Sequence, residues 1–364
     1  MRVRGNPRLR LLDRTFGAPI LWALGRLPKR PAPGRIERLG ILRTHAVGDT
    51  LLLQGILADA RAALPDADIV LITGEDNAQA GALIVGRNAR QLEVSVLSPL
   101  AAMARLQRER FNVLVDVSSW PRLDALLTAT SGAHFRVGFR TRGQYRHYAF
   151  DRTVDHAPER HQVENYRALF RAIGVPSTSA PSLANAHLPA VSTPPSPFVV
   201  FHPWSGGFKG HNKEWPLDRW VRLGTLLKRH GSVVVTGAPA NAAAAEHLSE
   251  SLRSAGVEAR SVAGHMTLAQ TAALLASSLA VVSVNTGIMH LAAVLGVRTV
   301  TLDGPTSAKR WGAIGPRVTS VESALPGCGF LDLGFEYNGH RADCMLGIEV
   351  ERVTNAVDKL IATT

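Results

Sequence analysis

Residues 281–296 read VVSVNTGIMHLAAVLG, and this stretch changes from a strand pattern to a helix pattern in its middle. The β-branched run at 281–284 predicts a buried strand, and the apolar residues of 288–295 recur at helical spacing. Asn285-Thr286-Gly287 lies between them. A turn of this kind places free backbone N–H groups at the carboxyl edge of a sheet, where α/β proteins bind phosphates. The alternative is an ordinary strand-to-helix turn without a ligand.

The same alternation of strand and helix patterns runs through both halves of the chain. Strands are predicted at 39–43, 69–73, 113–117, 198–201, 232–236, 279–284 and 297–302. Helices are predicted at 49–64, 161–173, 217–230, 240–255, 267–277 and 350–361. Residues 189–197 contain four prolines and no apolar periodicity, which is typical of a linker. The pattern therefore predicts an α/β protein with two doubly wound, Rossmann-like domains that face each other across a cleft.

The domain boundaries follow from these patterns. We expect an N-terminal arm at 1–38, a first domain at 39–188, the linker at 189–197, a second domain at 198–346 and a closing helical segment at 347–364.

Composition narrows the class of protein. The chain has 364 residues, of which 46% are hydrophobic and 19% charged, enough apolar material for two cores. No apolar run approaches the roughly 20 residues that span a bilayer, and no signal-peptide cleavage pattern is present. Cys328 and Cys344 could pair, but nothing else indicates an exported, disulfide-built protein, so both are interpreted as reduced and the protein as cytoplasmic.

The positive charge is concentrated in the arm. Residues 1–43 hold eleven Lys and Arg against two acidic residues, or nine of the net charge of +12. Basic residues that alternate with Leu, Phe, Ile and Trp are typical of a helix on an anionic membrane surface, such as the inner face of a bacterial inner membrane. A disordered basic tail is the equal alternative. Nucleic acid is excluded as a partner because no binding motif accompanies the charge.

Four loops at predicted strand ends carry candidate binding residues. Lysine, glycine and hydroxyl side chains at such positions suit a diphosphate, although surface lysines are most often simply solvated. The candidates in the second half are His202, Ser205, Gly206, Lys209, Lys213, Gly237, Asn241, Asn285, Thr286, Gly287, His290, Gly304 and Thr306. His290 has the alternative of a structural histidine inside a helix.

The loop RTHAVGDT at 43–50 occupies the corresponding edge of the first domain. Asp49 either caps the following helix or acts as a general base on a substrate hydroxyl. These roles compete, since a carboxylate bonded to backbone N–H groups has a lowered pKa and is a weaker base.

Several classes of protein are excluded by missing motifs. The chain has no GxxxxGK[ST] P-loop and no GxGxxG after a predicted strand. It also has no CxxC pair, no zincin spacing of histidines and no DxD at a strand end. Nucleotide hydrolysis by a P-loop, dinucleotide-dependent redox chemistry and metal-held sugar nucleotides are therefore disfavoured.

With these motifs together, the chain resembles glycosyltransferase family 9, the bacterial heptosyltransferases of lipopolysaccharide core assembly. The resemblance runs from about residue 39 to the C-terminus. It rests on ILRTHAVGDTLLLQGILADARAALPDADI at 41–69, FHPWSGGFKGHNKEWPLDRW at 201–220, VVSVNTGIMHLAAVLG at 281–296 and DGPTSAKRWG at 303–312. A closing stretch around Cys344 and Met345 also matches.

The resemblance implies a GT-B fold, in which the acceptor binds the first domain, the nucleotide sugar binds the second, and the closing segment at 347–364 packs back on the N-terminal domain. It also implies an inverting transfer from a nucleotide-diphosphate sugar such as ADP-heptose, without a metal ion or other cofactor. It implies that Asp49 deprotonates the acceptor and that Lys213 and the loop residues above hold the leaving diphosphate. We further expect acceptor anions, such as those of a lipid-linked glycan, to be bound by basic or polar side chains of the first domain. These are Arg43, Thr44, Arg136, Arg140, Arg142 and Arg146, which a solvated basic loop would equally explain.

Two positions depart from the family pattern. The family commonly has Asp where this chain has Asn285, and often Glu or Asp where it has Asn241. Each exchange replaces a carboxylate with an amide in the expected donor pocket. A changed donor, a nucleotide-sugar epimerase of the same fold, and a non-catalytic nucleotide-sugar or glycan-binding protein remain as alternatives.

Overall fold

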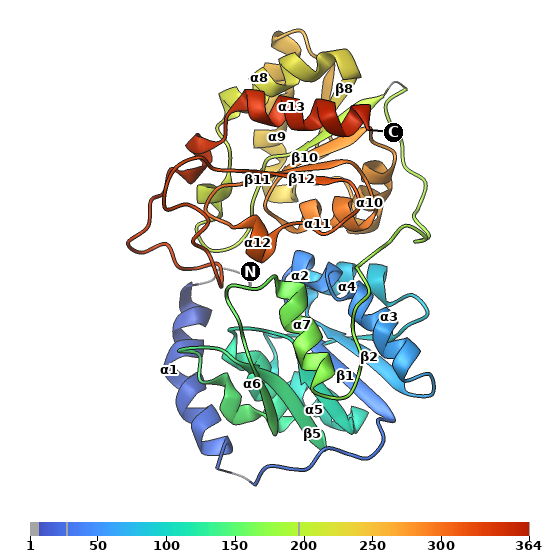
Figure 1. Cartoon of the computed structure of the whole chain (residues 1–364), viewed down its shortest axis with the longest axis vertical. Coiled ribbons are helices and arrows are strands. Elements are labelled where there is room, and N and C mark those ends of the chain that lie inside the picture. Colours follow the sequence, from blue (N-terminus) through green and yellow to red (C-terminus); the bar gives the residue numbers. More distant parts are fainter. Residues whose placement is uncertain (1–6, 27, 196, 364) are drawn as a thin grey trace. The chain divides into compact units, whose positions relative to one another are not determined.

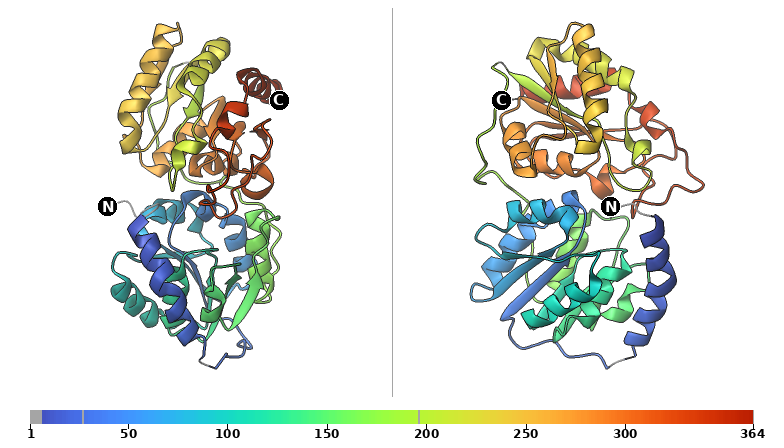
Figure 2. Two further views of the ribbon diagram at one scale, coloured as in Figure 1. Left: turned by 90° about the vertical axis from the view of Figure 1, so that its left-hand side faces the viewer. Right: turned by 180° about the vertical axis from the view of Figure 1, so that it is seen from behind.

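The computed structural model describes residues 7–26, 28–195 and 197–363, so the first six residues of the arm lie outside the described residues. The chain divides into two compact units, Met1–Pro181 and Ser182–Thr364. Each unit has a six-stranded parallel sheet with helices on both faces (Figures 1 and 2). The predicted α/β class with two Rossmann-like domains is confirmed.

The first sheet has the order β3-β2-β1-β4-β5-β6, and all of its strand pairs are parallel. Its strands are β1 (Arg38–Arg43), β2 (Asp68–Thr73), β3 (Arg90–Glu93), β4 (Val113–Asp116), β5 (Phe135–Arg140) and β6 (Arg152–Asp155). The helices of this unit are α1 (Pro7–Leu24), α2 (Val47–Leu51), α3 (Gln54–Ala63), α4 (Ala78–Val85), α5 (Pro99–Glu109), α6 (Arg122–Thr130) and α7 (Gln162–Arg171).

The second sheet repeats this topology with the order β12-β11-β10-β7-β8-β9. Its strands are β7 (Phe198–His202), β8 (Ser232–Val235), β9 (Ala259–Ser261), β10 (Ala280–Val284), β11 (Thr299–Asp303) and β12 (Val318–Glu322). Its helices are α8 (Leu217–Leu227), α9 (Ala242–Ser254), α10 (Leu268–Ala276), α11 (Gly287–Val294), α12 (Ala308–Trp311) and α13 (Val350–Ala362). Strands β4, β7, β8, β10 and β11 are buried at every residue, because helices cover both faces of a parallel sheet.

The helix predicted at 49–64 is two helices, α2 and α3. A tighter bond from the Leu53 N–H to the Thr50 carbonyl separates them. The linker also differs from its predicted place. The Leu183 N–H donates to the Val294 carbonyl, so the second unit begins at Ser182 rather than after the prolines.

The C-terminal helix α13 corrects another expectation. We expected the segment 347–364 to pack on the N-terminal domain. Instead, Val350, Val353 and Val357 belong to the hydrophobic core of the second unit, where α13 lies against α8 and the strands β10–β12. Its apolar residues recur at helical spacing on one buried face, and that face is already used within its own unit.

Cys328 and Cys344 form a disulfide, so the interpretation of both as reduced is wrong. Their Cα atoms lie 5.7 Å apart. The bond closes the loop between them. Met345, which follows Cys344, packs against Gly304. A Cβ atom built on Gly304 would lie 2.3 Å from the Met345 sulfur. The sequence allowed this pair, but no wider disulfide framework surrounds the two cysteines, which favoured the reduced form.

The arm contains an ordered helix, α1, that packs on α6 and the short 3-10 helix after β5. Asp13 accepts hydrogen bonds from the backbone N–H groups of Arg122 and Leu123 and pairs with the Arg122 guanidinium at 3.0 Å. Gly17 permits close approach, since a Cβ atom there would lie 2.8 Å from Arg122. The helix is therefore a fixed part of the first unit.

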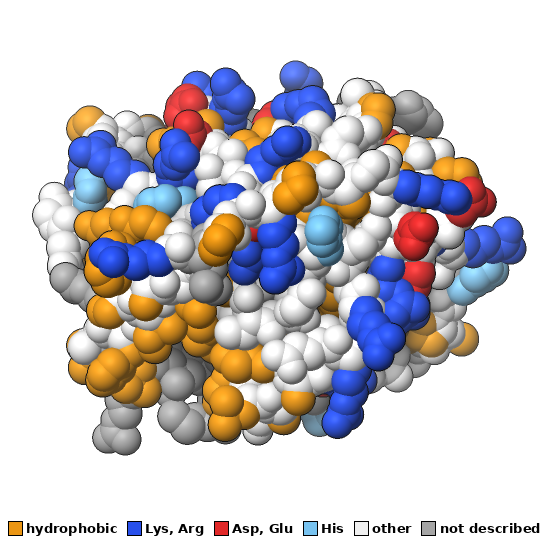
Figure 3. Space-filling view, turned by 90° about the horizontal axis from the view of Figure 1, so that it is seen from below, with side chains coloured by type: hydrophobic (Ala, Val, Ile, Leu, Met, Phe, Trp, Pro, Cys, Tyr) orange, Lys and Arg blue, Asp and Glu red, His pale blue; other side chains and the backbone are white. Residues whose placement is uncertain are grey.

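The opposite side of α1 is apolar and exposed. Leu11, Leu12, Phe16, Ile20 and Trp22 are large hydrophobic side chains open to solvent. In the view from below, hydrophobic side chains gather toward one side of the face, and Lys and Arg side chains are spread over the rest (Figure 3). Among the described helices, none is both long and apolar enough to cross a bilayer.

Candidate functional site

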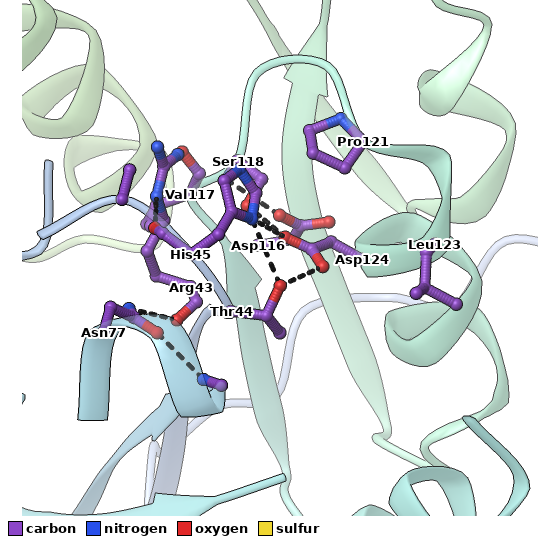
Figure 4. A network of polar contacts seen from close by, with 12 residues as sticks. Arg43, Thr44, His45, Asn77, Asp116, Val117, Ser118, Pro121, Leu123 and Asp124 are labelled. Atoms are coloured by element: carbon purple, nitrogen blue, oxygen red, sulfur yellow. Dashed lines mark hydrogen bonds and ion pairs between the residues drawn. The ribbon is translucent and has the colours of Figure 1, made fainter. Parts of the chain in front are cut away.

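Each sheet reverses its strand order beside its first strand, between β1 and β4 and between β7 and β10. At such a point the following loops diverge, and α/β proteins bind ligands in the space left at the carboxyl edge. In the first unit this edge carries Arg43–Asp49 and Val117–Asp124. Figure 4 shows their polar side chains converging there.

Asp49 does not cap α2, because the N-cap residue is Ala46 and no side chain caps that helix end. Its carboxylate accepts from two buried groups instead. Arg43 Nη2 lies 2.6 Å from Oδ2, and the Tyr166 hydroxyl donates to Oδ1 at 2.9 Å. Burial raises the pKa of Tyr166, so this phenol remains a donor.

Arg43 also holds the backbone of the loop. Its Nε donates to the His45 carbonyl at 3.0 Å and its Nη1 to the Val117 carbonyl at 3.4 Å. Asn77 supports the loop from the other side, since its Nδ2 donates to the Arg43 carbonyl and the Thr50 hydroxyl. Arg43 was predicted to bind an acceptor anion. Because it is buried and bonded to Asp49 and two carbonyls, it is a positioning residue, and that prediction is corrected.

A second polar group centres on the buried carboxylate of Asp124. The Thr44 hydroxyl donates to Oδ1 at 2.6 Å, and the Ser118 hydroxyl donates to Oδ2. His45 Nδ1 lies 3.6 Å from Oδ2 and 3.2 Å from the Thr44 hydroxyl (Figure 4). The Thr44 hydroxyl therefore donates its hydrogen bond to Asp124 within the protein. Sequence reasoning missed Asp124 and His45, since Asp124 lies inside a helix distant in the chain.

The remaining predicted acceptor arginines divide into two classes. Arg146 is fully buried, where it pairs with Asp116 and donates to the Ser118 and Pro121 carbonyls. Arg136 is buried and bound through two nitrogens to Asp151 at 2.8 Å. The prediction that these two bind an acceptor is corrected, because each already has a carboxylate partner. Arg140 and Arg142 are exposed, and Arg140 lies 3.5 Å from the exposed Asp155.

In the second unit, the segment after β7 forms the first part of the candidate donor site. His202 is buried, and burial lowers its pKa to about 4, so the ring is neutral at pH 7. Its Nδ1 lies 2.9 Å from the Thr236 hydroxyl, which makes it a supporting residue at the end of β7. The Ser205 N–H donates to Glu214 at 3.1 Å and holds the glycine-containing turn closed. Gly206 and Gly207 in that turn are exposed.

Two lysines flank this turn. Lys209 is exposed in the left-handed backbone region at φ 49°, and its Nζ lies 5.9 and 5.8 Å from the ring centres of Phe208 and Tyr337. Lys213 ends a short 3-10 helix, Gly210–Lys213, and is half-buried. Burial raises the pKa of Tyr337 to about 12, so its hydroxyl also stays protonated.

The turn after β10 differs from its predicted role at Asn285. Its Nδ2 donates to Asp303 Oδ1 at 2.6 Å and to the Trp311 carbonyl at 3.3 Å. Burial raises the pKa of Asp303 to about 6, against hydrogen bonds from Thr301 and Asn285 that lower it. Asn285 is therefore a partner of a buried carboxylate through its amide nitrogen, and its contact with the donor stays a prediction.

The other residues of this edge are near the start of α11. Thr286 and Gly287 are half-buried at the N-terminal end of the helix, which leaves the first N–H groups for an anion. His290 is buried inside α11. Gly304 packs against Met345, so its role is close packing.

Gly237 and Asn241 lie at the start of the segment that leads into α9, and both are half-buried. Gly237 approaches the Trp204 ring, since a Cβ atom there would lie 2.8 Å away.

Thr306 is the most informative of the predicted residues. It is buried, and its hydroxyl has no hydrogen-bond partner within the described residues. Two further buried groups, the Trp204 indole N–H and the Tyr337 hydroxyl, also have no hydrogen-bond partner within the described residues. The sequence did not single them out. A buried donor without a partner costs about 1–3 kcal/mol. Other polar atoms of this unit, such as the Trp220 indole nitrogen and the Ser232 hydroxyl, are also buried without a partner, so Thr306 is singled out by its place just after β11 at the carboxyl edge of the sheet.

Comparison with known proteins agrees with this geometry. The model of glycosyltransferase family 9 (heptosyltransferase) matches residues 100–328. Lipopolysaccharide heptosyltransferase 1 of Escherichia coli K12 is 28% identical over 298 residues, which covers 76% of this chain and 91% of that protein.

Solved structures of the same family share the fold. The family 9 glycosyl transferase of Veillonella parvula superposes with a TM-score of 0.73 at 16% identity, covering 92% of this chain and all of that one. The E. coli heptosyltransferase WaaC, solved with ADP, gives 0.69 at 21% identity and covers 89% of this chain and 99% of its own.

Replacement of the Asn285 amide tests the Asp303 contact. Asn285→Asp removes a donor and places a second carboxylate in a buried site. Carboxyl groups whose pKa is raised on folding lose stability as pH rises from the unfolded value near 4 through the folded value. We therefore expect the melting temperature to fall more at pH 8 than at pH 5, with a loss of about 3 kcal/mol at pH 8.

Asn241→Asp is the matched control, since it makes the same exchange at a half-buried helix start. Its stability should change by less than about 0.5 kcal/mol. An Asn285→Asp protein as stable as the wild type at pH 8 would contradict the assignment.

Proposed function

The chain belongs to glycosyltransferase family 9 and is a glycosyltransferase, and within that family we propose that it transfers a heptose or a related sugar from a nucleotide-diphosphate sugar. ADP-heptose is the proposed donor, and a lipopolysaccharide core or similar lipid-linked glycan is the proposed acceptor. The E. coli relative that matches most of the chain is a lipopolysaccharide heptosyltransferase, which supports this choice.

The observation that carries the donor proposal is the unpartnered hydroxyl of Thr306. It follows β11, next to the strand that leads into the N-terminal end of α11. The helix end offers N–H groups, and Lys209 and Lys213 offer mobile positive charge from the segment after β7. Hydroxyl, amide and ammonium donors at one sheet edge suit the two phosphates of a leaving nucleoside diphosphate.

The proposed reaction inverts the anomeric centre. The acceptor oxygen would attack the anomeric carbon as the bond to the diphosphate oxygen breaks, and the lysines with Thr286, Gly287 and Thr306 would stabilise the charge on the leaving group. We propose that no metal ion or other cofactor takes part. Among residues 7–26, 28–195 and 197–363, no cluster of three or more His, Cys, Asp or Glu side chains is arranged to hold a metal. Asp49 is the residue that the family pattern proposes as base, and exposed Arg140 and Arg142 are the proposed acceptor contacts.

A transfer assay tests the function. The full-length protein is incubated with a heptose-deficient lipopolysaccharide acceptor and with ADP-heptose, UDP-glucose or GDP-mannose, and released nucleotide is measured. We expect acceptor-dependent release with ADP-heptose alone. Release with another sugar nucleotide would support a glycosyltransferase but contradict ADP-heptose as its donor. No release with any of the three would contradict the proposed function.

Thr306→Val tests the donor site separately from turnover. Since the hydroxyl has no partner within the described chain, its loss should leave or raise the melting temperature of the ligand-free protein. The stabilisation by ADP should fall, because a ligand that binds only the folded state raises the melting temperature more the more tightly it binds. We expect ADP to bind about 10-fold more weakly, equivalent to about 1.4 kcal/mol.

The control is Thr354→Val in α13, whose hydroxyl donates to the Val350 carbonyl at 2.9 Å. It should lower stability slightly and leave the ADP-induced shift unchanged. An unchanged ADP shift in Thr306→Val would remove Thr306 from the donor site.

We also propose that α1 binds an anionic membrane surface at the cytoplasmic face of the bacterial inner membrane. Its buried side is fixed on α6, and its exposed side presents Leu11, Leu12, Phe16, Ile20 and Trp22. The helix carries Arg8, Arg10 and Arg14 against Asp13, and residues 1–43 as a whole hold nine net positive charges. Apolar and basic residues on one segment match an anionic bilayer, which attracts basic residues and accepts apolar ones. This placement would bring the enzyme to a lipid-linked acceptor.

Vesicle flotation tests this surface. The double variant Leu12→Glu and Phe16→Glu should lose most binding to vesicles that contain phosphatidylglycerol, because charge at these positions opposes insertion. Wild-type binding should be much weaker on phosphatidylcholine vesicles and should fall with added salt.

Leu100→Glu is the matched control, since Leu100 on α5 is 80% exposed and lies outside α1. It should float like the wild type. Flotation of the α1 variant at the wild-type level would contradict the proposal, and a wild-type protein that dimerises through α1 without floating would assign the surface to a second copy.

A further inference from the structure

The disulfide between Cys328 and Cys344 closes the loop formed by residues 329–343, here named the disulfide loop. Every residue of this segment is described, and it contains no helix or strand, only one isolated bridge at Leu331. It lies between β12 and a 3-10 helix, Cys344–Gly347. Its position is therefore set by its contacts with neighbouring segments and by the disulfide at its base.

One group of contacts joins the disulfide loop to the segment after β11. Leu331 pairs with Thr306 in the isolated bridge, and the Leu331 N–H donates to the Pro305 carbonyl at 3.0 Å. Beside the disulfide, the Gly329 N–H donates to the Gly304 carbonyl at 3.0 Å. The backbone that carries the Thr306 hydroxyl is therefore held by the loop.

Asp332 extends this contact to α12. Its carboxylate accepts from Arg310 Nε at 3.0 Å, and its carbonyl accepts from the Trp311 indole N–H at 2.9 Å. The Trp311 carbonyl in turn accepts from Asn285 Nδ2 at 3.3 Å. The loop is thus linked to the turn after β10 through one further residue.

A second group of contacts joins the disulfide loop to the segment after β7. The ring centres of Tyr337 and Phe208 lie 6.2 Å apart, and Lys209 Nζ lies 5.8 Å from the Tyr337 ring centre. Phe330 meets the Tyr337 ring edge-on at 5.9 Å and stacks on His340 at 4.2 Å. Lys209 is one of the two lysines proposed for the diphosphate, so the loop contacts both sides of the proposed donor site.

The two cysteines differ in exposure. Cys344 is fully buried, and Cys328 is half-buried in a turn between two glycines, Gly327 and Gly329, at positive φ. An outside thiolate therefore reaches the disulfide from the Cys328 side. The proposed place of this enzyme, at the cytoplasmic face of the membrane, is a reducing one. Disulfides in such a compartment usually act in redox sensing or catalysis.

We propose that the Cys328–Cys344 disulfide is a redox switch on donor binding, so that a dithiol reductant opens the disulfide loop and lowers the affinity for the nucleoside diphosphate. This rests on the proposed donor site. Once the disulfide is broken, the segments that carry Thr306 and Lys209 lose a fixed support. They must then be ordered when the donor binds, a cost that a site fixed on folding avoids.

The chemistry of the switch is thiol–disulfide exchange. A thiolate of the reductant attacks the Cys328 sulfur, and the electron pair of the broken bond leaves on Cys344, which takes up a proton. The second thiolate of the reductant then displaces Cys328, which also takes up a proton. The reductant ends as a disulfide and the protein as two thiols.

The experiment measures the affinity of the full-length protein for ADP by calorimetry, after oxidation and after treatment with dithiothreitol. We expect the reduced protein to bind ADP about 10-fold more weakly, and the affinity to return on reoxidation. Reduction should also speed cleavage of the disulfide loop by chymotrypsin, since a loop held by fewer contacts opens more readily. Thiol titration of the denatured protein reports the state of the cysteines in each sample.

Cys328→Ser is the matched variant, since it replaces only the half-buried sulfur and leaves Cys344 in its buried place. It should bind ADP like the reduced wild type, with or without dithiothreitol. The sequence has no third cysteine, so an effect of dithiothreitol on this variant would assign the change to another cause and overturn the switch. ADP affinity in Cys328→Ser equal to that of the oxidised wild type would overturn it as well.

Two further results separate this inference from the proposed function. Equal ADP affinity in the oxidised and reduced wild type, or two thiols that persist after oxidation, would overturn the switch and leave the donor site standing. An oxidised protein that binds no ADP would contradict the proposed donor itself, and the switch with it.

Discussion

The reversal of strand order beside the first strand of each sheet is the constraint on which the sites depend. In a parallel sheet covered on both faces, the strand backbones are fully used by ladder hydrogen bonds and the side chains by the core. Only the loops at the carboxyl edge can present polar groups. The reversal separates two neighbouring loops, so polar groups gather after β1 and β4 in one unit and after β7 and β10 in the other. The same topology thus produces one polar edge in each unit.

The first of these edges is held by buried charges that neutralise one another. Arg43 pairs with Asp49, and Arg146 pairs with Asp116. Removing one member of such a pair costs about 3–5 kcal/mol, because the other charge stays buried without a partner. At Asp116 burial and pairing act in opposite directions. Burial raises the pKa of Asp116 to about 7, although Arg146 and a backbone N–H lower it. These pairs fix the loops, and the exposed Arg140 and Arg142 lie outside them.

Periodicity predicted most strands and helices, because a parallel α/β core requires continuous apolar strands and one-sided helices. It could not show which arginines are buried. Arg136, Arg140, Arg142 and Arg146 read as one basic stretch, yet Arg136 and Arg146 are buried against carboxylates from elsewhere in the unit. The Thr44–Asp124 contact likewise joins residues 80 positions apart. Tertiary contacts therefore determine which arginines are buried and which groups bond to Asp124. Such contacts also hold α13 in the second unit and join Cys328 to Cys344.

The exchange of a family carboxylate for Asn285 has a local explanation in Asp303. The amide nitrogen of Asn285 donates to that carboxylate at 2.6 Å, and both groups are buried. Two carboxylates at this distance could not both be ionised at neutral pH. An amide at 285 and a carboxylate at 303 therefore form a matched pair in which one negative charge remains at this edge of the sheet. The departure from the family pattern at Asn285 is then matched to its neighbour Asp303. Asn241 lacks such a partner among the described contacts, so any change in donor preference should be sought there.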